Sequence, residues 1–461
     1  MTKHLDIDTK AMRAKILDLA IRGKLTDQRQ EDGNARDLLK EIQAEKERLI
    51  KEKKIKKEKP LPEITEEEKP FDIPENWEWV RLGEIIELQS GQDFPKSKYS
   101  DTDKEGIPYI TGASCFTKNG VLENRWTRFP KCIATKGDIL LVCKGSGYGK
   151  ITVCNLQEVH IARQIMAIKR NEHLSLSYIE SFLMARIKLI KENGQGLIPG
   201  ISRDIVLNLL FPLPPLAEQQ RIADKVSALF AQLDVIDKAY EEYQELQQAM
   251  KAKLLELAIQ GKLTDQRKED GDARDLFQDI QEEKQRLIAE KKIKKEKPLP
   301  EIEADEIPFE IPENWMWVRI GDIFTLQSGK SIKANEISVK QDDEYRYPCF
   351  GGNGIRGYVK AFNREGDYPI IGRQGALCGN INFSSGKFYA TEHAVVTDGY
   401  SKVNAYWAVI FLKALNLNQY ATATAQPGLS VTKINTVLIP LPPLAEQQRI
   451  VVKLDELLLL L

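Results

Sequence analysis

Two clusters of polar residues stand on glycine-rich stretches and have the side chains that read DNA. Arg and Lys bind guanine, Asn and Gln bind adenine, and Lys, Ser, Thr and backbone N–H groups bind phosphate. Glycines at 145, 147 and 149 would let the backbone approach a phosphate closely. Alternatively, these glycines and polar residues merely form exposed turns. We predict DNA contact by Lys144, Ser146, Tyr148, Lys150, Arg163, Gln164, Ser202 and Arg203, and by Asn353, Arg356, Arg373, Gln374, Gln426, Ser430 and Lys433.

Signatures of enzymes are incomplete in this chain. "FGGNG" at Phe350–Gly354 fits an S-adenosylmethionine site, but the next residues do not start a helix and no [DNS]PP[YFW] motif follows, so we predict a turn in a DNA-reading loop. "GSGYGKIT" at Gly145–Thr152 lacks the spacing of a P-loop. The four histidines have no metal-ligand spacing, and His393 is predicted to be a satisfied core or loop residue. We therefore predict no catalytic, cofactor or metal site here.

The two clusters belong to a duplicated module. Ala11–Leu39 matches Ala249–Phe277 at an offset of 238, and "PLPPLAEQQRI" occurs at Pro212–Ile222 and again at Pro440–Ile450. Similarity fades between these frames, where the clusters lie. A repeat this long is a duplicated module with an internal pseudo-twofold relation, not a solenoid. One scaffold thus presents two different readers.

The repeated segments have helical periodicity. Apolar residues after Ile222 recur at spacings of four and three, with a break at Gln247, which predicts a coiled-coil strand. The predicted seam comprises Ile222, Val226, Leu229, Leu233, Ile236, Tyr240, Tyr243, Met250, Leu254 and Leu257, then Leu5, Met12, Ile16 and Leu19, and finally Ile450, Leu454 and Leu457. The variable blocks mix strand-like and helical segments, so we expect an α+β protein with two globular α/β domains.

Composition excludes several classes of protein. The 461 residues are 42% hydrophobic with a net charge of −1, and no apolar run is long enough to cross a membrane. The N-terminus has no signal-peptide pattern, and the six cysteines form no CxxC pair, which favours a reduced, cytoplasmic protein. Residues 72–211 carry 18 Lys and Arg against 16 Asp and Glu, and residues 310–439 carry 13 against 11. Each block alone should therefore bind DNA weakly.

The ordered frame of "PENWEWVRLGEI", "GDILLVCKGSGYGK", "PGIS" and "PLPPLAEQQRI", followed by a long helix, resembles the specificity (S) subunit of type I restriction–modification enzymes. The second block, with "YPCFGGNGIRGY", "PIIGRQGALCGNINF" and "AQPGLS", is similar to a common class of target-recognition domain in that family. The resemblance implies a non-catalytic subunit whose two target-recognition domains each read half of an asymmetric bipartite DNA site. It also implies a long antiparallel coiled coil between those domains, and two methyltransferase (M) subunits with, in some complexes, two restriction (R) subunits. S-adenosylmethionine would then belong to the M subunits, and ATP and Mg²⁺ to the R subunits.

The resemblance also implies domain limits. We expect a helical segment at 1–70, recognition domains at 71–211 and 309–439, a central coiled-coil segment at 212–308 and a helix stub at 440–461. The N-terminal segment resumes almost where the C-terminal stub stops, which predicts a circularly permuted arrangement with neighbouring termini. Two other hypotheses are a fused methyltransferase–specificity protein, which the missing methyltransferase domain disfavours, and a coiled-coil adaptor, which would not need two unlike blocks.

Overall fold

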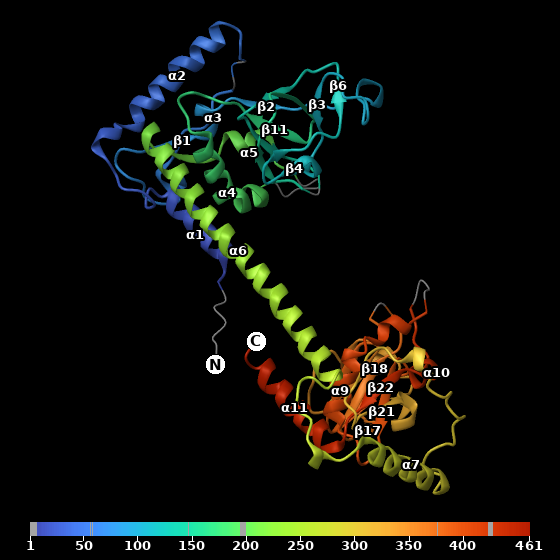
Figure 1. The fold of residues 1–461 in the computed structure, drawn as a ribbon. Helices are drawn as coiled ribbons and strands as arrows, with labels where there is room; N and C mark the ends of the chain where they lie inside the picture. The colour runs from blue at the N-terminus through green and yellow to red at the C-terminus, as the bar shows by residue number, and fades with distance from the viewer. Residues whose placement is uncertain are drawn as a thin grey trace. The chain divides into compact units, whose positions relative to one another are not determined.

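A computed structural model describes residues 7–55, 57, 59–145, 147–193, 200–375, 377–422 and 427–461 (Figure 1). The chain divides into two compact units, one ending at Tyr240 and the other beginning at Glu241. The long helix α6 (Leu216–Ile259) contributes to both units. Within the described residues, no helix is long and apolar enough to span a membrane.

The first unit joins helices to short strands. Its helices are α1 (Thr9–Ile21), α2 (Ala35–Lys51), α3 (Leu82–Ile85), α4 (Leu176–Asn193) and α5 (Arg203–Leu207), besides the first part of α6. Its strands are β1 (Glu78–Arg81), β2 (Leu88–Ser90), β3 (Ile107–Ile110), β4 (Phe116–Thr117), β5 (Gly120–Val121), β6 (Trp126–Thr127), β7 (Ile133–Thr135), β8 (Ile139–Val142), β9 (Ile151–Val153), β10 (Glu158–Ile161), β11 (Ile165–Ile168) and β12 (Leu210–Leu213).

The second unit repeats this plan. Its helices are α7 (Ala273–Ala289), α8 (Ile320–Ile323), α9 (Ala405–Ala414), α10 (Val431–Asn435) and α11 (Leu444–Leu458), besides the rest of α6. Its strands are β13 (Met316–Arg319), β14 (Phe324–Ser328), β15 (Tyr347–Gly351), β16 (Gly354–Val359), β17 (Arg364–Glu365), β18 (Tyr368–Gly372), β19 (Ile381–Ser384), β20 (Lys387–Ala390), β21 (Ala394–Gly399) and β22 (Leu438–Leu441).

Both variable blocks build the same sheets. The order β2-β11-β8-β9 in the first unit corresponds to β14-β21-β18-β19 in the second, and β6-β3-β10-β7 corresponds to β16-β15-β20-β17. The pairs β1–β12 and β13–β22 close each block antiparallel, so the frame residues before and after a block lie together. The fold is thus α+β with two similar sheet-rich domains, as the sequence predicted, although the strand order was not foreseen.

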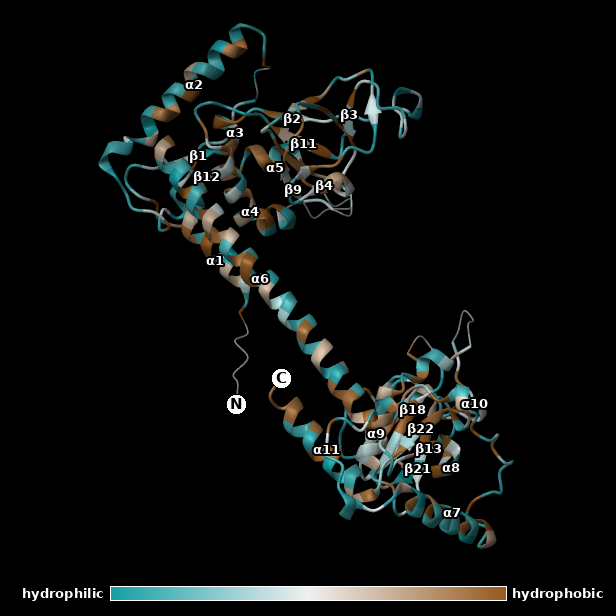
Figure 2. Ribbon diagram, viewed as in Figure 1, coloured by the Kyte–Doolittle hydropathy of each residue, from teal (hydrophilic) through white to brown (hydrophobic). Residues whose placement is uncertain are grey.

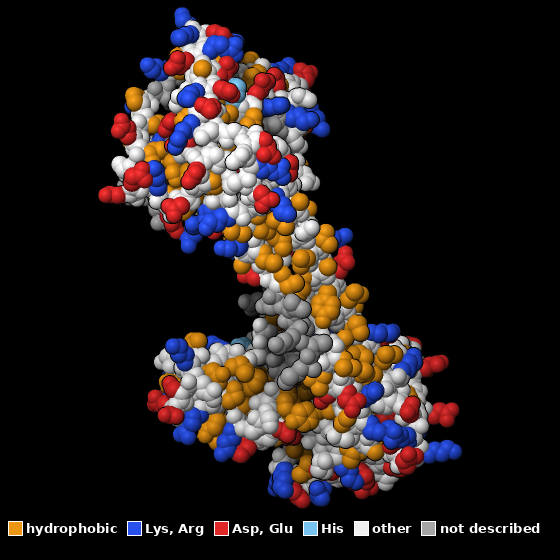
Figure 3. All heavy atoms as spheres, turned by 90° about the vertical axis from the view of Figure 1, so that its left-hand side faces the viewer, with side chains coloured by type: hydrophobic (Ala, Val, Ile, Leu, Met, Phe, Trp, Pro, Cys, Tyr) orange, Lys and Arg blue, Asp and Glu red, His pale blue; other side chains and the backbone are white. Residues whose placement is uncertain are grey.

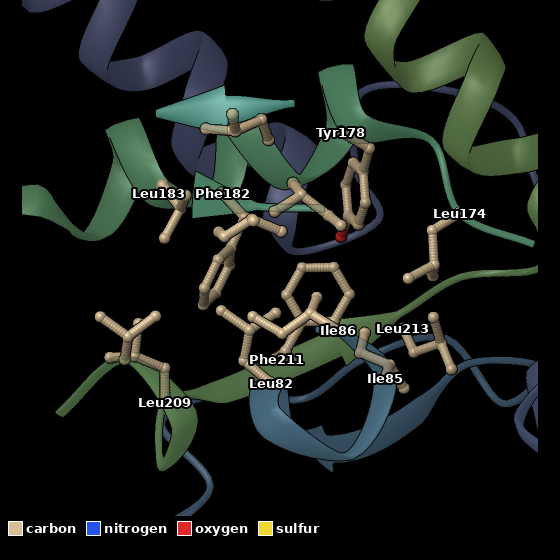
Figure 4. Packing of buried hydrophobic residues seen from close by; sticks show 14 of the residues in the cluster. Leu82, Ile85, Ile86, Leu174, Tyr178, Phe182, Leu183, Leu209, Phe211 and Leu213 are labelled. Carbon is tan, nitrogen blue, oxygen red and sulfur yellow. The ribbon is translucent and has the colours of Figure 1, made fainter. Parts of the chain in front are cut away.

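Aromatic residues fill the core of the first unit, where α4 packs on β12 (Figure 4). Tyr178, Phe182 and Phe211 are fully buried, with ring centroids 5.5 Å and 4.8 Å apart for the Tyr178–Phe211 and Phe182–Phe211 pairs. Figure 2 shows the same apolar character inside both units and in bands along α6. Burial of such rings is a major source of stability.

Identical polar contacts hold the frame of each unit. The indole Nε1 of Trp77 donates to Glu218 (2.8 Å), and that of Trp315 donates to Glu446 (2.7 Å). Buried arginines at 81 and 319 bind backbone carbonyls and a glutamate each. A buried polar group is tolerated when it is paired in this way. These residues belong to the repeated motifs and explain why "WVR" and "AEQQRI" occur in both halves.

The two ends of the chain pair with different parts of α6. In the first unit α1 runs antiparallel to α6, because Thr9 contacts Asp237 (2.6 Å) and Arg13 contacts Asp234 (2.8 Å). In the second unit α11 lies beside the end of α6, and the carbonyl oxygen of Leu461 accepts a hydrogen bond from Gln247. Each pair buries part of the predicted seam: Ile222, Val226, Leu233, Ile450 and Leu454 are buried, and Leu229, Ile236, Leu254, Leu257, Ile16, Leu19 and Leu457 are half-buried.

The middle of the predicted seam differs from expectation. Tyr240, Tyr243 and Met250 are 54%, 43% and 51% exposed, whereas Gln247, read as a break, is buried. Met12 is also exposed, and Leu5 lies outside the described residues. Tyr240 lies beyond Asp237, which faces Thr9 at the start of α1. Tyr243 and Met250 lie in the part of α6 beside α11, where Gln247 takes the buried position and bonds Leu461 instead. Figure 3 shows apolar side chains along this exposed stretch of helix, which includes Val235 and Leu246.

Candidate nucleic-acid interface

The same tight loop joins β8 to β9 in the first unit and β18 to β19 in the second. Gly145 and Gly149 have φ of +89° and +86°, and their counterparts Gly375 and Gly379 have +91° and +87°. Backbone bonds repeat as well: the N–H of Gly149 donates to Val142 (2.7 Å), and that of Gly379 donates to Gly372. Glycine adopts this left-handed conformation without strain, so the loop needs glycine at these two places.

A second segment is fixed beside each loop. Gly200 bridges Lys144, and Gly428 bridges Gln374. The next residue also bonds to the loop, because the N–H of Ile201 donates to Cys143 (2.8 Å) and that of Leu429 donates to Arg373 (2.9 Å). The repeated "PGIS" and "PGLS" motifs therefore bring α5 and α10 against the loops, which we call the reading loops (143–150 and 373–380).

The first predicted cluster gathers around its reading loop. Lys144 and Lys150 are exposed on the loop, and the ring of Tyr148 lies 5.3 Å from the Lys191 ammonium. Ser202 is exposed, but its hydroxyl caps α5 by accepting from the N–H of Ile205. The structure therefore brings Lys144, Tyr148, Lys150 and Ser202 together. Ser146 lies outside the described residues.

Of the remaining first-cluster residues, Arg163 and Arg203 already have side-chain partners, whereas the buried side-chain oxygen of Gln164 has none among the described residues. Arg163 is 69% exposed and pairs with Asp93 at 2.7 Å. Arg203 donates to the carbonyl of Leu88 and faces away from the loop, towards β2. Gln164 is half-buried, and its backbone carbonyl accepts from Cys143 (2.7 Å). Arg163 and Arg203 would therefore have to exchange or share a contact in order to touch DNA.

The second predicted cluster divides in the same way. Gln374 is exposed on the reading loop, and Ser430 caps α10 by accepting from the N–H of Lys433 (3.1 Å). Arg373 is half-buried and donates to the Ser328 hydroxyl (3.0 Å). Lys433 lies 5.7 Å from the ring of Tyr420. Gln426 lies outside the described residues.

Two predicted residues come from a neighbouring hairpin, β15–β16. Asn353 and Arg356 are both exposed there, and the amide oxygen of Asn353 lies 3.5 Å from Asn380 Nδ2. "FGGNG" forms this hairpin turn, which agrees with the turn predicted for it. The hairpin approaches the second reading loop closely, because a side chain at Gly372 would meet the carbonyl oxygen of Gly352.

Sequence reasoning missed two residues of the second loop. Leu377 is 54% exposed and Asn380 is exposed, at the positions that Gly147 and Lys150 occupy in the first loop. The signal was available, because the glycines at 145 and 149 align with those at 375 and 379 at an offset of 230. An apolar tip residue can contact a thymine methyl group, and asparagine can read adenine.

One histidine lies beside the second reading loop, because the carbonyl of His393 accepts a hydrogen bond from the N–H of Arg373 (3.0 Å). Among the described residues, no group of His, Cys, Asp and Glu could hold a metal ion. His160 is buried, stacks on Phe94 and bonds the carbonyl of Gln92 (2.8 Å). The prediction that His393 is satisfied was wrong for one ring atom: its buried Nδ1 has no hydrogen-bond partner in the described part of the chain, while Nε2 lies 3.4 Å from Glu392. Glu392 is its neighbour in sequence and reaches only one side of the ring.

Two similar sheet-rich units, each with a glycine-hinged polar loop, define a protein with two binding modules on a shared helical frame. The model of the type I restriction modification DNA specificity domain matches residues 74–245 and 312–460, so the chain belongs to that family. It is a specificity subunit of a type I restriction–modification system, with DNA sequence recognition as its role.

Named relatives agree with this assignment. The chain is 30% identical to the EcoAI specificity subunit of Escherichia coli, over 97% of this chain and 89% of the relative. It is 32% identical to the EcoEI specificity subunit of Escherichia coli, over 68% and 61%. A solved structure described as the basis of "complex assembly and conformational transition of the type I R-M system" matches 84% of this chain and 91% of its own, with a TM-score of 0.56 and 21% identity. That last likeness supports the fold alone.

Proposed function

We propose that the two units read the two halves of an asymmetric, bipartite DNA site. One observation carries this proposal: the reading loops share backbone bonds and glycine positions but present different side chains, Lys144, Tyr148 and Lys150 against Gln374, Leu377 and Asn380. Base readout depends on side-chain type, so unlike tips select unlike half-sites. Ser202 and Ser430 cap the short helices beside the loops and so help to hold those helices against them.

The subunit itself carries out no chemistry in this proposal. Two M subunits methylate adenine at the chosen site, and two R subunits, where present, cleave DNA. S-adenosylmethionine therefore binds the M subunits, and ATP and Mg²⁺ bind the R subunits. The complex acts in the cytoplasm, where its chromosomal substrate lies. Support comes from the incomplete enzyme motifs, since the S-adenosylmethionine-like "FGGNG" is a hairpin turn.

We also propose that the repeated frame gives each part of α6 its own partner helix within its own unit. In support, α1 pairs with the first part of α6 and α11 with the last part, each within its own unit. The repeat relates the two pairs, because Ala11–Leu39 corresponds to Ala249–Phe277 and Pro440–Ile450 to Pro212–Ile222. Domains at 71–211 and 309–439 then act as exchangeable readers on this frame.

A block exchange tests the assignment of half-sites. Residues 72–211 are replaced by the corresponding block of a specificity subunit with a different first half-site, and the chimera is assembled with the M subunit. Methylated adenines are then mapped on a random DNA library. We expect one half-site to change and the other, with its adenine, to be retained. A change in both halves, or in neither, would show that these blocks do not read independently.

A further inference from the structure

A cationic cleft lies outside the reading loops, between α2, β2 and the start of α5 in the first unit. Its volume is about 520 Å³. Lys46, Lys54, Lys57 and Arg203 line it, against a single carboxylate, Glu87. Four cations around one carboxylate make a binding site for an anion larger than a single ion.

The floor of the cleft is rigid. Lys46 Nζ donates to the carbonyls of Gly83 (2.7 Å), Glu84 (3.2 Å) and Ile86 (3.1 Å), so its charge is held in place. Arg203 is tied to the carbonyl of Leu88. A positive charge fixed before binding loses little entropy when a ligand arrives.

The rim is more open. Lys57 is exposed, and Lys54 is 64% exposed, with its ammonium 2.7 Å from Glu52. Burial raises the pKa of Glu87, although the nearby ammonium of Lys169 opposes this shift. The one carboxylate of the lining therefore carries its charge less readily than an exposed glutamate.

The second half of the chain keeps the same cations. Residues 52–64 and 290–302 are identical, and Lys46, Lys54 and Lys57 correspond to Lys284, Lys292 and Lys295 at the offset of 238. Lys284 also donates to a backbone carbonyl, that of Gly321 (2.7 Å).

Where the halves differ, their charge balance is preserved. Arg203 corresponds to Val431, and Glu87 corresponds to Thr325, so one cation and one anion are lost together. The cations were kept while the reading loops diverged. The ligand must therefore be common to both halves and independent of base sequence.

We propose that Lys54 and Lys57, supported by the fixed positive charges of Lys46 and Arg203, and the matching lysines of the second half, bind backbone phosphates of the DNA next to each half-site. This inference rests on the proposed function. Arg203 stands three residues after Gly200, which bridges Lys144 on the reading loop, so one segment joins the loop to the cleft, although the Arg203 guanidinium itself faces away from the loop, towards β2. An acidic protein segment is the weaker fit, because Ile86 and Leu88 are buried and Ile55 is half-buried, which leaves this lining without the exposed apolar anchors of protein interfaces.

The test removes one exposed lysine per half in the complex with M subunits. The variant is Lys57→Gln with Lys295→Gln, and the matched control is Lys40→Gln with Lys268→Gln, two exposed lysines elsewhere. Affinity is measured between 0.05 and 0.3 M salt for a duplex carrying the mapped site and for one with that site scrambled. Each lost phosphate contact should lower the log–log salt slope by about 0.9, which is about eightfold in affinity at 0.1 M salt.

We expect the same loss on both duplexes, a slope lower by about 1.8, and no change in the control. An unchanged salt slope with normal site preference would overturn the cleft and leave the proposed function intact. Absence of site preference in the unaltered complex would instead overturn the proposed function. If native mass spectrometry shows loss of M subunits, and excess M subunit restores DNA affinity, the lysines dock a protein and the proposal is wrong.

Discussion

The two reading loops show how one backbone accommodates two chemistries. The first has Lys144 and Lys150 where the second has Gln374 and Asn380, and Gly147 where the second has Leu377. Yet the glycine φ angles differ by only a few degrees, and the same backbone groups are bonded. Main-chain hydrogen bonds fix the loop, so the exposed side chains at 144 and 150 can differ from those at 374 and 380 without a change of backbone. Position 147 is confined in the first unit, because a side chain there would lie 2.2 Å from Ala113. Lysines favour guanine or phosphate, whereas Gln, Asn and an exposed Leu favour A·T pairs.

The largest effects are expected from glycine substitutions, which should change the stability that the loop backbone provides without changing the exposed side chains that contact DNA. Gly149 and Gly379 share a positive φ, but a side chain at Gly379 would lie 2.4 Å from the backbone nitrogen of Asn418, whereas at Gly149 it would meet the flexible end of Lys191. Alanine at a left-handed position costs about 1–2 kcal/mol. Overlap with a fixed backbone adds about 1–3 kcal/mol. Gly379→Ala should therefore destabilise its unit by about 2–5 kcal/mol, and Gly149→Ala by about 1–2 kcal/mol.

Gly375→Ala supplies the control for strain alone. Its φ is +91°, and nothing lies within 4 Å of the added carbon. Hydrogen exchange measured against urea reports each unit separately and gives the three free energies of opening. If Gly379→Ala costs no more than Gly375→Ala, close packing against Asn418 does not hold the second loop.

Substitutions of the exposed side chains on the reading loops should change DNA recognition and leave the stability of the units unchanged. Gln374→Ala should weaken binding to the native site by roughly 1–3 kcal/mol and relax one A·T position of the second half-site only. Lys144→Ala should act on the first half-site only. Competition binding with single-base variants of each half-site distinguishes the two. A uniform loss on all sequences after Lys144→Ala would assign that lysine to phosphate, and unchanged binding after Gln374→Ala would remove this loop from the base-reading surface.

Arg373 is expected to differ from its neighbour Gln374 in its role, because its side chain is held against the sheet rather than exposed. It occupies the position of buried Cys143, and its guanidinium binds Ser328. The sequence suggested equal roles for Arg373 and Gln374, because both are polar and adjacent. Only the bridge to Gly428 shows that Gln374 faces outwards while Arg373 lies against the sheet.

The repeated segments made the shared frame of the fold predictable. The strand order within the two variable blocks was not predictable, because their sequences differ. The Trp77–Glu218 and Trp315–Glu446 contacts lie in motifs that occur twice, so their place in a shared frame could be inferred. The matching strand orders could not, because the two blocks have little similarity between their glycines. The exposed Tyr240 was missed for another reason: heptad spacing describes one helix and does not reveal where its partner begins.

The smallest expected effect lies in the shared frame, and it depends on pH. Burial raises the pKa of Glu218, even though hydrogen bonds from Trp77 and Gln28 lower it. The Arg221 guanidinium, by its hydrogen bond, lowers the pKa of Asp32, whose side chain is 3% exposed. These two carboxyl groups flank the same arginine and should respond to pH with opposite sign.

A raised pKa means that folded Glu218 binds its proton more tightly than the unfolded chain does. Its contribution is therefore most favourable at low pH, and it falls as pH rises from the ordinary glutamate pKa through the raised one. Asp32 contributes fully above the ordinary aspartate pKa and loses that contribution as pH falls through its lowered value. Glu218→Gln should thus become more stable relative to the native chain as pH rises from about 4 to 7. Asp32→Asn should become less stable relative to the native chain as pH rises through the range below about 4, between the lowered pKa of Asp32 and the ordinary aspartate value. Urea unfolding of the first unit, followed by hydrogen exchange at each pH, measures both slopes. Slopes of the same sign would mean that the pKa values of Glu218 and Asp32 are not shifted in opposite directions around Arg221.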